Sequence, residues 1–229
     1  MKLLALDTST EACSAALYID GEIEQRFEMA PREHTQLILP MIDDLLSAAD
    51  IKIKQLDALA FGRGPGSFTG VRIATGIVQG MAFGADLPVI PVSTLASIAQ
   101  SVYDDHHHTS VLAAIDARMG EVYWGQFRIN QQGIMVLVGE EMVIKPDQVS
   151  SLLEDEWAGA GSAWAVYENL LNRSLVQPVN HYYADYYPQS GSIAKLAVYD
   201  FEQGVRLSAD QAIPLYLRND VAKKSTKTK

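Results

Sequence analysis

Residues 2–7, Lys2-Leu3-Leu4-Ala5-Leu6-Asp7, form an apolar run that ends in a carboxylate. A short aliphatic run of this kind predicts a buried strand with Asp7 at its end. The same ending, Ala114-Ile115-Asp116, recurs 109 residues further along this chain of 229 residues. Repetition at about half the chain length predicts a duplicated fold, in which each half opens with an equivalent strand.

The segments after these two strands extend the parallel between the halves. Strands are expected over 13–19 and 22–29, joined by an Asp20-Gly21 turn that is typical of a hairpin. The other elements expected in the first half are helices over 35–49, 71–83 and 93–103 and strands over 56–61 and 88–92. The second half is expected to hold strands over 111–116, 121–129 and 133–144 and helices over 146–154, 163–171 and 190–201.

A polar, unpatterned stretch at 104–109 separates the two series of elements. It reads as a solvated linker that contains the consecutive histidines 106–108. The sequence therefore predicts two βββαβα-type subdomains, at 1–105 and 106–205, with the second one degenerate. A C-terminal extension at 206–229 follows them.

Two α/β halves that each open with a strand ending in Asp resemble the duplicated actin-like ATPase (ribonuclease H-like) fold of sugar kinases, heat-shock chaperones and actin. This is an analogy between folds. In that fold the two loops after the Asp strands hold nucleotide phosphates and their metal. The residues that would form a vestigial nucleotide-binding site here are Asp7, Thr8, Ser9, Asp116 and Arg118. Asp and Thr at strand ends are also common turn formers, so both alternatives stand at this point.

Composition places the chain among folded globular proteins, with 48% apolar residues, 20% charged residues and a mean hydropathy of +0.02. There is one cysteine, and every apolar stretch is shorter than a membrane span, so we expect a cytoplasmic chain without disulfides or a membrane segment. The balance of 18 basic and 28 acidic residues, a net charge of −10, disfavours nucleic-acid binding by the chain alone. The last seven residues nevertheless contain four lysines, at 223, 224, 227 and 229. This tail is either a solvated end or a contact arm for RNA or an acidic partner.

A glycine-rich loop at 62–70, Gly-Arg-Gly-Pro-Gly-Ser-Phe-Thr-Gly, precedes the second expected helix. A Walker loop requires a lysine that the loop lacks, and the dinucleotide fingerprint fails because Ser67 or Thr69 stands where it requires a third glycine. Two roles stay open for the loop. It would bind an anion through its amides at the helix N-terminus, or it makes a sharp crossover from strand to helix.

Within the second expected helix, Gly76, Gly80 and Gly84 recur at every fourth residue. Glycine in a helix interior costs about 0.8–1 kcal/mol relative to alanine, so close packing must offset this cost. The neighbouring row of Ala74, Ile77, Val78 and Met81 is apolar as well. Two faces of this helix therefore need burial, either within the chain or against a partner.

No catalytic or metal-binding constellation stands out in the sequence. A helical zinc motif needs two histidines four residues apart, but His34 is followed at that distance by Ile38. His181 is isolated, and neither Ser67 nor Ser190 has the two flanking glycines of a serine nucleophile elbow. We therefore expect no metal site and no catalytic residue.

Several segments resemble the bacterial TsaB (YeaZ) family. They are Leu4 to Thr10, Pro31 to Gln36, Gly62 to Arg72, Ile115 to Trp124 and Pro214 to Asn219. The resemblance runs nearly from end to end, and it implies an actin-like fold. It also implies a role in forming N6-threonylcarbamoyladenosine at position 37 of tRNAs that read codons starting with A. The paralogue TsaD carries a His-x-x-x-His metal motif whose second histidine is replaced here by Ile38, which argues against intrinsic transferase or metallopeptidase activity.

The resemblance implies a non-catalytic chain that activates the transferase TsaD as a heterodimer, with the ATPase TsaE as a third member. It implies no intrinsic cofactor, allows ATP and Mg²⁺ within the complex, and leaves tRNA contacts mainly to the partner. It also implies a homodimer when the chain is alone. The expected interface lies on the first two helices, at Leu37, Pro40, Met41, Leu45, Val71, Ala74, Gly76, Ile77, Val78, Gly80 and Met81. The alternative function is a stand-alone ATP-dependent phosphotransferase that uses Asp7 and Asp116.

Overall fold

The structure, a computed structural model, describes residues 1–152 and 156–218. Its first half contains a five-stranded sheet in the order β3-β2-β1-β4-β5. The strands are β1 (Lys2–Asp7), β2 (Ala12–Ile19), β3 (Glu22–Met29), β4 (Ala58–Gly62) and β5 (Val89–Val92). β1 pairs antiparallel with β2 and parallel with β4, so it lies at the centre of the sheet. The helices of this half are α1 (His34–Ala48), α2 (Phe68–Ala85) and α3 (Thr94–His106).

The second half repeats this topology with the strand order β10-β9-β6-β7-β8. Its strands are β6 (Ser110–Asp116), β7 (Val122–Ile129), β8 (Met135–Ile144), β9 (Ala158–Ala160) and β10 (His181–Tyr183). Its helices are α4 (Ala163–Ser174) and α5 (Ser190–Glu202), and single 3₁₀ turns lie at Ile53–Gln55, Pro146–Gln148 and Ala209–Gln211. Read from its β8 end, the second order corresponds to the first, and β6 lies between antiparallel β7 and parallel β9 as β1 lies between antiparallel β2 and parallel β4. This confirms the predicted duplicated α/β fold of the actin-like ATPase type.

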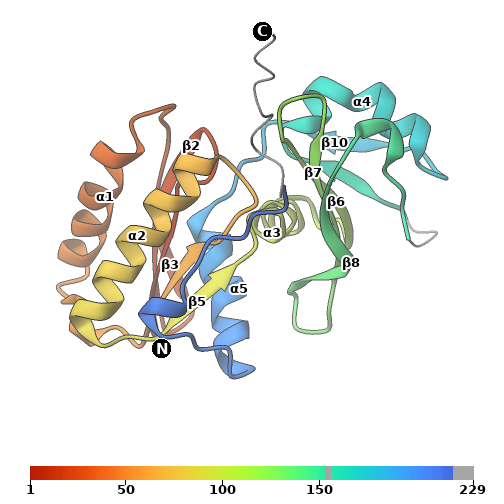
Figure 1. The fold of residues 1–229 in the computed structure, drawn as a ribbon. Coiled ribbons are helices and arrows are strands. Elements are labelled where there is room, and N and C mark those ends of the chain that lie inside the picture. The colour runs from red at the N-terminus through yellow and green to blue at the C-terminus, as the bar shows by residue number, and fades with distance from the viewer. Residues whose placement is uncertain (153–155, 219–229) are drawn as a thin grey trace, which may run out of the picture.

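The helices are exchanged between the halves. α3 packs on β6, β7 and β8 of the second sheet, whereas α5 packs on β1, β2, β4 and β5 of the first sheet. Figure 1 shows α3 and α5 side by side between the two sheets. Each of these two helices therefore packs on the sheet of the other half. Together they join the predicted subdomains 1–105 and 106–205 through one common apolar core.

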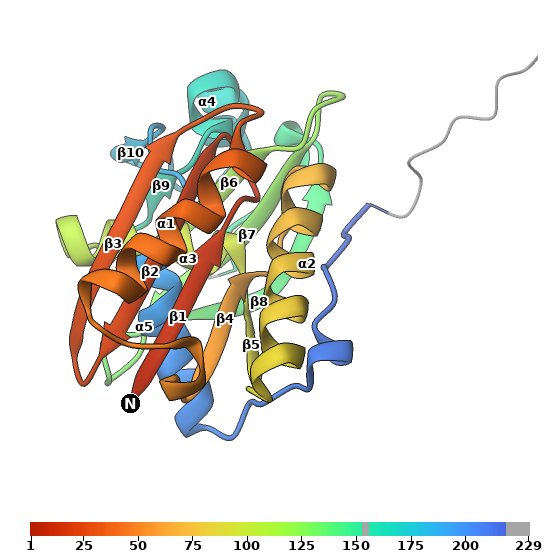
Figure 2. The same ribbon diagram turned by 90° about the vertical axis from the view of Figure 1, so that its left-hand side faces the viewer.

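Successive side chains of β1 point to opposite faces of the sheet, so this strand contributes to two hydrophobic cores. Leu3 and Ala5 face α3 and α5 in the central core, and Leu4 and Leu6 face the core beneath α1 and α2. All four side chains are fully buried. Figure 2 shows α1 and α2 together on the outer face of the first sheet. A third core lies between the second sheet and α4, around the indoles of Trp124 and Trp164.

The helix predicted over 146–154 is wrong for the residues that the structure describes. A 3₁₀ turn at Pro146–Gln148 replaces it, and residues 153 and 154 lie outside the described part. The Gln126 amide on β7 donates to the Ser150 carbonyl at 2.9 Å and accepts from the Leu152 amide at 2.8 Å. These bonds take backbone groups that a helix would use, and the described residues between β8 and β9 form no counterpart of α1. The three-residue strands β9 and β10 were not predicted, because they are too short to show a period.

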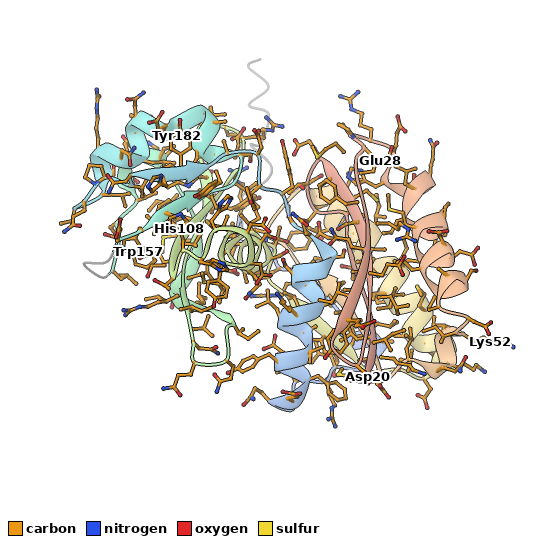
Figure 3. All side chains as sticks on the ribbon, turned by 180° about the vertical axis from the view of Figure 1, so that it is seen from behind. Asp20, Glu28, Lys52, His108, Trp157 and Tyr182 are labelled. Carbon is orange, nitrogen blue, oxygen red and sulfur yellow. The ribbon has the colours of Figure 1, made fainter. Side chains whose placement is uncertain are left out.

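The predicted solvated linker is shorter than 104–109, because α3 continues to His106. His106 stacks on Tyr183 with a centroid distance of 4.1 Å, and His108 Nε2 lies 2.9 Å from the Tyr183 hydroxyl. Figure 3 shows His108 within the second half. The histidines are therefore part of an aromatic corner between α3 and β10. Across residues 1–152 and 156–218, no helix has the length and apolarity needed to cross a membrane.

Candidate functional site

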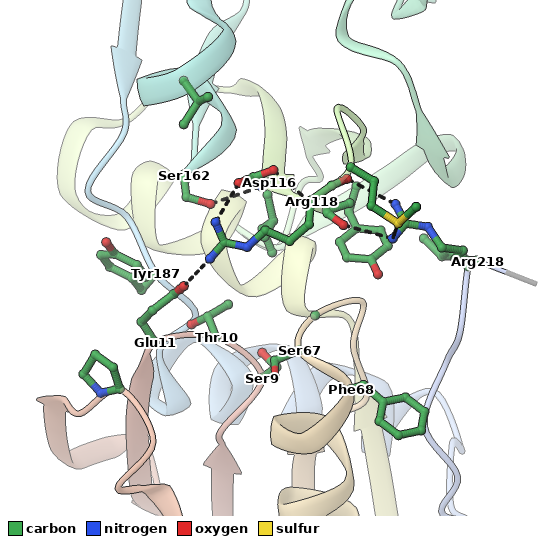
Figure 4. A pocket seen from close by; sticks show the side chains of 18 of the residues that line it. Ser9, Thr10, Glu11, Ser67, Phe68, Asp116, Arg118, Ser162, Tyr187 and Arg218 are labelled. Carbon is green, nitrogen blue, oxygen red and sulfur yellow. Dashed lines mark hydrogen bonds and ion pairs between the residues drawn. The ribbon is translucent and has the colours of Figure 1, made fainter. Parts of the chain in front are cut away.

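A cleft of about 850 Å³ lies between the two halves. Both loops that follow the Asp strands reach it, and the N-terminal ends of α1, α2 and α4 line its walls. Figure 4 shows Ser9, Thr10 and Glu11 on one side of the cleft and Asp116, Arg118 and Ser162 on the other.

Asp7 does not reach this cleft. Its side chain is fully buried, and its Oδ1 accepts bonds from the Ser9 amide and the Ser9 hydroxyl, each at 2.8 Å. Burial raises the pKa of the Asp7 carboxyl from 3.8 to about 6, although the two bonds from Ser9 lower it in part. The carboxylate is thus enclosed by its own loop and by the protein interior.

The glycine-rich loop encloses Asp7 and its neighbours by direct backbone contact. A Cβ at Gly62 would lie 1.7 Å from Asp7 Oδ2, and a Cβ at Gly70 would lie 1.9 Å from the Thr8 carbonyl. Likewise, a Cβ at Gly66 would lie 2.3 Å from the Ser9 carbonyl. Glycine is needed at these three positions because any side chain would collide with the first loop.

These contacts correct part of the predicted nucleotide site. Thr8 is fully buried and its hydroxyl donates to the Gly70 carbonyl at 2.7 Å, so neither Asp7 nor Thr8 faces the cleft. Ser9, Asp116 and Arg118 do line it. The loop makes the crossover into α2, which the Ser67 hydroxyl caps by accepting from the Gly70 amide at 3.4 Å.

Arg118 bridges the cleft. Its guanidinium donates to Asp116 Oδ2 at 3.1 Å and to Glu11 Oε1 at 3.3 Å, so it links the second half to the first. The loop that presents it has positive φ at Arg118, Met119 and Gly120. With its side chain 74% exposed, Arg118 remains open to solvent. Arg118, predicted as part of a nucleotide site, is thus paired with two carboxylates of its own chain.

His34 and Ile38, which occupy the two histidine positions of the His-x-x-x-His metal motif, have structural roles here. The ring of His34 is buried, with its Nε2 2.8 Å from the Thr10 carbonyl, and Ile38 lies in the core beneath α1. Among the residues that the structure describes, no group of three or more His, Cys, Asp or Glu side chains is arranged to hold a metal ion.

Sequence reasoning missed a C-terminal strap, residues 212–218, that runs along the cleft. The Leu215 amide donates to the Arg63 carbonyl at 2.8 Å in the first half. In the second half, Arg218 donates to the Ala117 carbonyl at 3.1 Å and forms an ion pair with Glu121. Leu215, Tyr216 and Leu217 line the cleft. The conspicuous Pro214 to Asn219 motif was a signal for this strap, but no periodicity indicates where an irregular segment docks.

A buried polar bridge also connects the halves. Arg63 Nη2 lies 3.2 Å from Glu141 Oε2 on β8, and the Ser93 hydroxyl bonds to the same carboxylate. The Glu141 side chain is only 4% exposed. Burial raises the pKa of the Glu141 carboxyl, while the Ser93 bond and the Arg63 charge lower it in part.

The predicted interface residues on α1 and α2 fall into two sets, one buried within the chain and one with exposed surface. Leu45, Val71, Ala74 and Val78 are wrong as partner-facing residues, because each is at most 1% exposed and forms the chain's own core. They lie on the sheet side of their helices. The predicted residues with exposed surface are Leu37, Pro40, Met41, Gly76, Ile77, Gly80 and Met81.

The glycine stripe lies on the open side of α2. A Cβ at Gly76, Gly80 or Gly84 would meet no atom within 4 Å, so the stripe has no packing partner within the described chain. Three large apolar residues of the same two helices are exposed although they were not predicted: Leu39 at 53%, Phe68 at 52% and Phe83 at 86% exposure. The helical period identifies two apolar faces here, but it does not tell which of them the sheet covers.

The chain is thus a duplicated α/β protein in which the glycine loop covers the first Asp loop and one helix face stays open. The family model described as "TsaD: tRNA N6-adenosine threonylcarbamoyltransferase" matches residues 27–226. The chain is 45% identical to the tRNA threonylcarbamoyladenosine biosynthesis protein TsaB of Escherichia coli, over 97% of this chain and 96% of that protein. Its namesake in Haemophilus influenzae is 44% identical, over 96% and 95% of the two chains.

Among solved structures, YeaZ from Pseudomonas aeruginosa superimposes with a TM-score of 0.89 and 45% identity. The match covers 94% of this chain and 99% of that one. A second structure, an uncharacterized protein with similarity to peptidase YeaZ from Pseudomonas aeruginosa, gives the same TM-score at 44% identity and covers 95% and 99% of the two chains. The chain belongs to the TsaB family.

Proposed function

We propose that this chain is a non-catalytic partner and activator of the transferase TsaD in the formation of N6-threonylcarbamoyladenosine on tRNA. The relatives' names support the pathway, since the E. coli and H. influenzae proteins are called tRNA threonylcarbamoyladenosine biosynthesis proteins. The matching TsaD family model supports a partner of related fold.

The open glycine stripe on α2 carries the proposal. Glycines within a helix cost about 2–3 kcal/mol for two or three positions, and no contact within the described chain offsets this cost at Gly76, Gly80 and Gly84. Another helix that packs on this stripe would approach closely enough to offset it. The exposed Leu39 and Phe83 would supply apolar area at the same surface.

The chemistry then belongs to the partner. In this proposal TsaD transfers the threonylcarbamoyl group, TsaE joins the pair, and ATP and Mg²⁺ bind within the complex rather than to this chain. The enclosed Asp7 supports this division, because its carboxylate is occupied by Ser9. The complex would act in the cytoplasm, and alone the chain would form a homodimer through the same face.

The test measures threonylcarbamoyladenosine formation on unmodified tRNA. Purified TsaD, TsaE, threonylcarbamoyl-adenylate and ATP are combined with and without this chain, and co-elution with TsaD is followed by size-exclusion chromatography. We expect modification to require the chain and the two proteins to co-elute. Full modification without the chain would contradict the proposal.

Gly80→Leu tests the surface itself. Leucine is a better helix former than glycine and meets no atom at this position, so the variant should be as stable as the wild type or more stable. We expect it to lose co-elution with TsaD and activation of TsaD. The control is Asn169→Leu, which adds the same side chain to an exposed position of α4 in the second half. Equal loss in both variants would remove the α2 face from the proposal.

A further inference from the structure

Two crossings of the chain between the halves meet at one place. α3 follows β5 of the first sheet and packs on the second sheet, and residues 184–189 lead from β10 back to α5, which packs on the first sheet. The end of α3 and this return segment meet at the aromatic corner. The side chains of the corner are those of His106, His108, His181, Tyr183 and Tyr186. A change in the relative position of the halves would therefore alter the contacts of this corner.

The last turn of α3 holds the return side of the corner through two tyrosines. The Tyr186 hydroxyl donates to Asp105 Oδ2 at 2.7 Å and lies 2.9 Å from His106 Nε2. Because its one proton goes to Asp105, this hydroxyl accepts the bond from His106. The Tyr183 ring stacks on the His106 ring at 4.1 Å, with 15° between the ring planes. Both tyrosines thus depend on the same turn of α3.

Three imidazoles lie close together in the aromatic corner. The ring centroids of His106 and His108 are 6.4 Å apart, and those of His108 and His181 are 5.7 Å apart. Both separations are shorter than the Debye length of about 8 Å at physiological ionic strength, so positive charges on these rings would repel one another. Neutral rings can pack in this arrangement, whereas charged rings weaken it.

The charged groups that face His108 disfavour its protonation. Burial lowers the pKa of His108 below its ordinary value of 6.5, and the neighbouring His181 and His106 lower it as well. Glu156, which precedes β9, raises this pKa, but its effect is the smallest of the four. Neutral His108 is therefore favoured in the folded corner, and this contribution to stability is lost as the pH falls from 6.5 toward the lowered pKa.

Two further carboxylates at the end of α3 already have partners. Asp104 Oδ2 lies 2.8 Å from the Lys195 ammonium of α5, and Asp105 accepts the bond from Tyr186. Burial, and then the neighbouring Asp105, raise the pKa of the Tyr186 hydroxyl, so this group keeps its proton. Neither carboxylate is free to pair with a charged ring on the β10 side of the corner.

We propose that the aromatic corner is a proton-sensitive hinge. Protonation of His106, His108 and His181 places like charges side by side, weakens the contact between α3 and residues 181–187, and lets the two halves move relative to one another. Histidine is the side chain whose charge ordinarily changes between about pH 5 and 8, so a modest acidification suffices. The released segment ends at Tyr187, which lines the cleft, so this wall of the cleft would loosen with it. The hinge goes beyond the proposed function, because it belongs to this chain alone.

Hydrogen exchange with mass spectrometry of the full chain tests the corner directly. Exchange is compared at pH 5.5 and 7.5 after correction for the intrinsic pH dependence of amide exchange. We expect peptides that cover 181–187 to exchange about tenfold faster at pH 5.5, while peptides of β1 stay protected. NMR titration of the imidazole signals should show His108 gaining its proton below pH 6.5.

Matched substitutions separate the effect of charge from the effect of shape. His181 is exposed, so His181→Gln removes its charge and His181→Lys makes the charge permanent, both with little loss of packing. We expect the double variant with His108→Gln and His181→Gln to keep protection at pH 5.5, and His181→Lys to lose it even at pH 7.5. The control is His107→Asn, because the His107 ring packs edge-on to Tyr103 and Asn tolerates its φ of 60°. This control should respond to pH as the wild type does.

Distances between spin labels report the movement of the halves. The labels are attached to Asp43→Cys on α1 and Asn169→Cys on α4, both exposed positions, in a chain whose own Cys13 is buried. The distance distribution should broaden between pH 7.5 and 5.5 in the wild-type corner and stay unchanged in the double histidine variant.

Equal protection of residues 181–187 at both pH values in the wild type would overturn the inference, as would the same loss of protection in the double variant. A distance distribution that does not change with pH would refute the hinge. Thermal melts check that each variant is folded at pH 7.5, and if the double variant is not, His181→Gln and His181→Lys provide the comparison. None of these measurements involves TsaD, so their outcome is independent of the proposed function.

Discussion

The carboxylate of Asp7 fills the space that any side chain at Gly62 would need. A Cβ at Gly62 would lie 1.7 Å from Asp7 Oδ2, although the two residues are at the ends of neighbouring parallel strands. The glycine loop can therefore pack directly on the Asp7 and Thr8 part of the first Asp loop. This contact explains both why the loop is rich in glycine and why Asp7 is enclosed.

Gly62→Ala should consequently destabilise the protein. The added methyl group cannot be accommodated without displacing Asp7, and we expect a loss of about 3 kcal/mol or more in the free energy of unfolding. Urea denaturation followed by circular dichroism measures it. Gly76→Ala is the control, because a Cβ there meets nothing and should add about 0.5–1 kcal/mol of stability. Equal stability of the two variants would contradict the close approach.

The pH dependence of stability should report the burial of Asp7. Because the folded pKa is raised from 3.8 to about 6, the folded state binds more protons than the unfolded state between these values. Stability should therefore fall as pH rises from about 4 to 6, and Asp7 should contribute about 3 kcal/mol to this fall. Asp7→Asn, which has no charge to bury, should lack that component. The free energy of unfolding of the wild type and of Asp7→Asn is measured with urea from pH 4 to 8. The same pH dependence in both proteins would contradict the raised pKa of Asp7.

Leu45 and Leu39 on α1 should respond oppositely to truncation. Leu45 is fully buried, so Leu45→Ala should cost about 2–5 kcal/mol of stability through the cavity it leaves. Leu39 is 53% exposed, so Leu39→Ala should leave the melting temperature nearly unchanged. Under the proposed function, Leu39→Ala should instead weaken association with TsaD. Thermal melts and titration calorimetry make the comparison, and a stable Leu45→Ala would contradict the assigned face.

Glu141 should hold the two halves together. Glu141→Ala leaves Arg63 and Ser93 without their buried partner, and we expect a loss of about 2–4 kcal/mol in chemical denaturation. Glu141→Gln keeps an oxygen for Ser93 and should cost less. The exposed pair of Arg26 and Asp44 provides the control, since Asp44→Ala should cost less than about 1 kcal/mol. A cost as small for Glu141→Ala would show that the bridge contributes nothing.

Arg218 should fasten the C-terminal strap. Arg218→Ala removes the ion pair to Glu121 and the bond to the Ala117 carbonyl, so the strap should open more often. We expect amide exchange at Leu215, which donates to the Arg63 carbonyl, to accelerate by about tenfold while core amides are unchanged. Hydrogen exchange with mass spectrometry detects this. Unchanged protection at Leu215 would mean that the strap is held from the first half alone.

Much of the local structure followed from the order of residues. The apolar runs of β1 and β6, the Asp20-Gly21 turn and the helical rows of α1 and α2 predicted these elements, because their periods are written along the chain. The repeated Asp endings predicted the duplication, and the loop's spacing excluded the known phosphate-binding templates. The resemblance to the TsaB family agrees with the 45% identity to the E. coli protein and with the superposition on YeaZ from Pseudomonas aeruginosa.

Contacts between distant residues determined the rest. A helical period shows that α2 has two apolar faces, but only the sheet determines that Ala74 and Val78 are buried while Gly76 and Gly80 stay open. The sequence by itself established a duplicated α/β chain with an unusual glycine loop. Three features are seen only in the tertiary structure: α3 and α5 each pack on the sheet of the other half, Asp7 is enclosed, and the strap lies along the cleft. Each of them depends on which surfaces meet in space, and no local sequence pattern determines that.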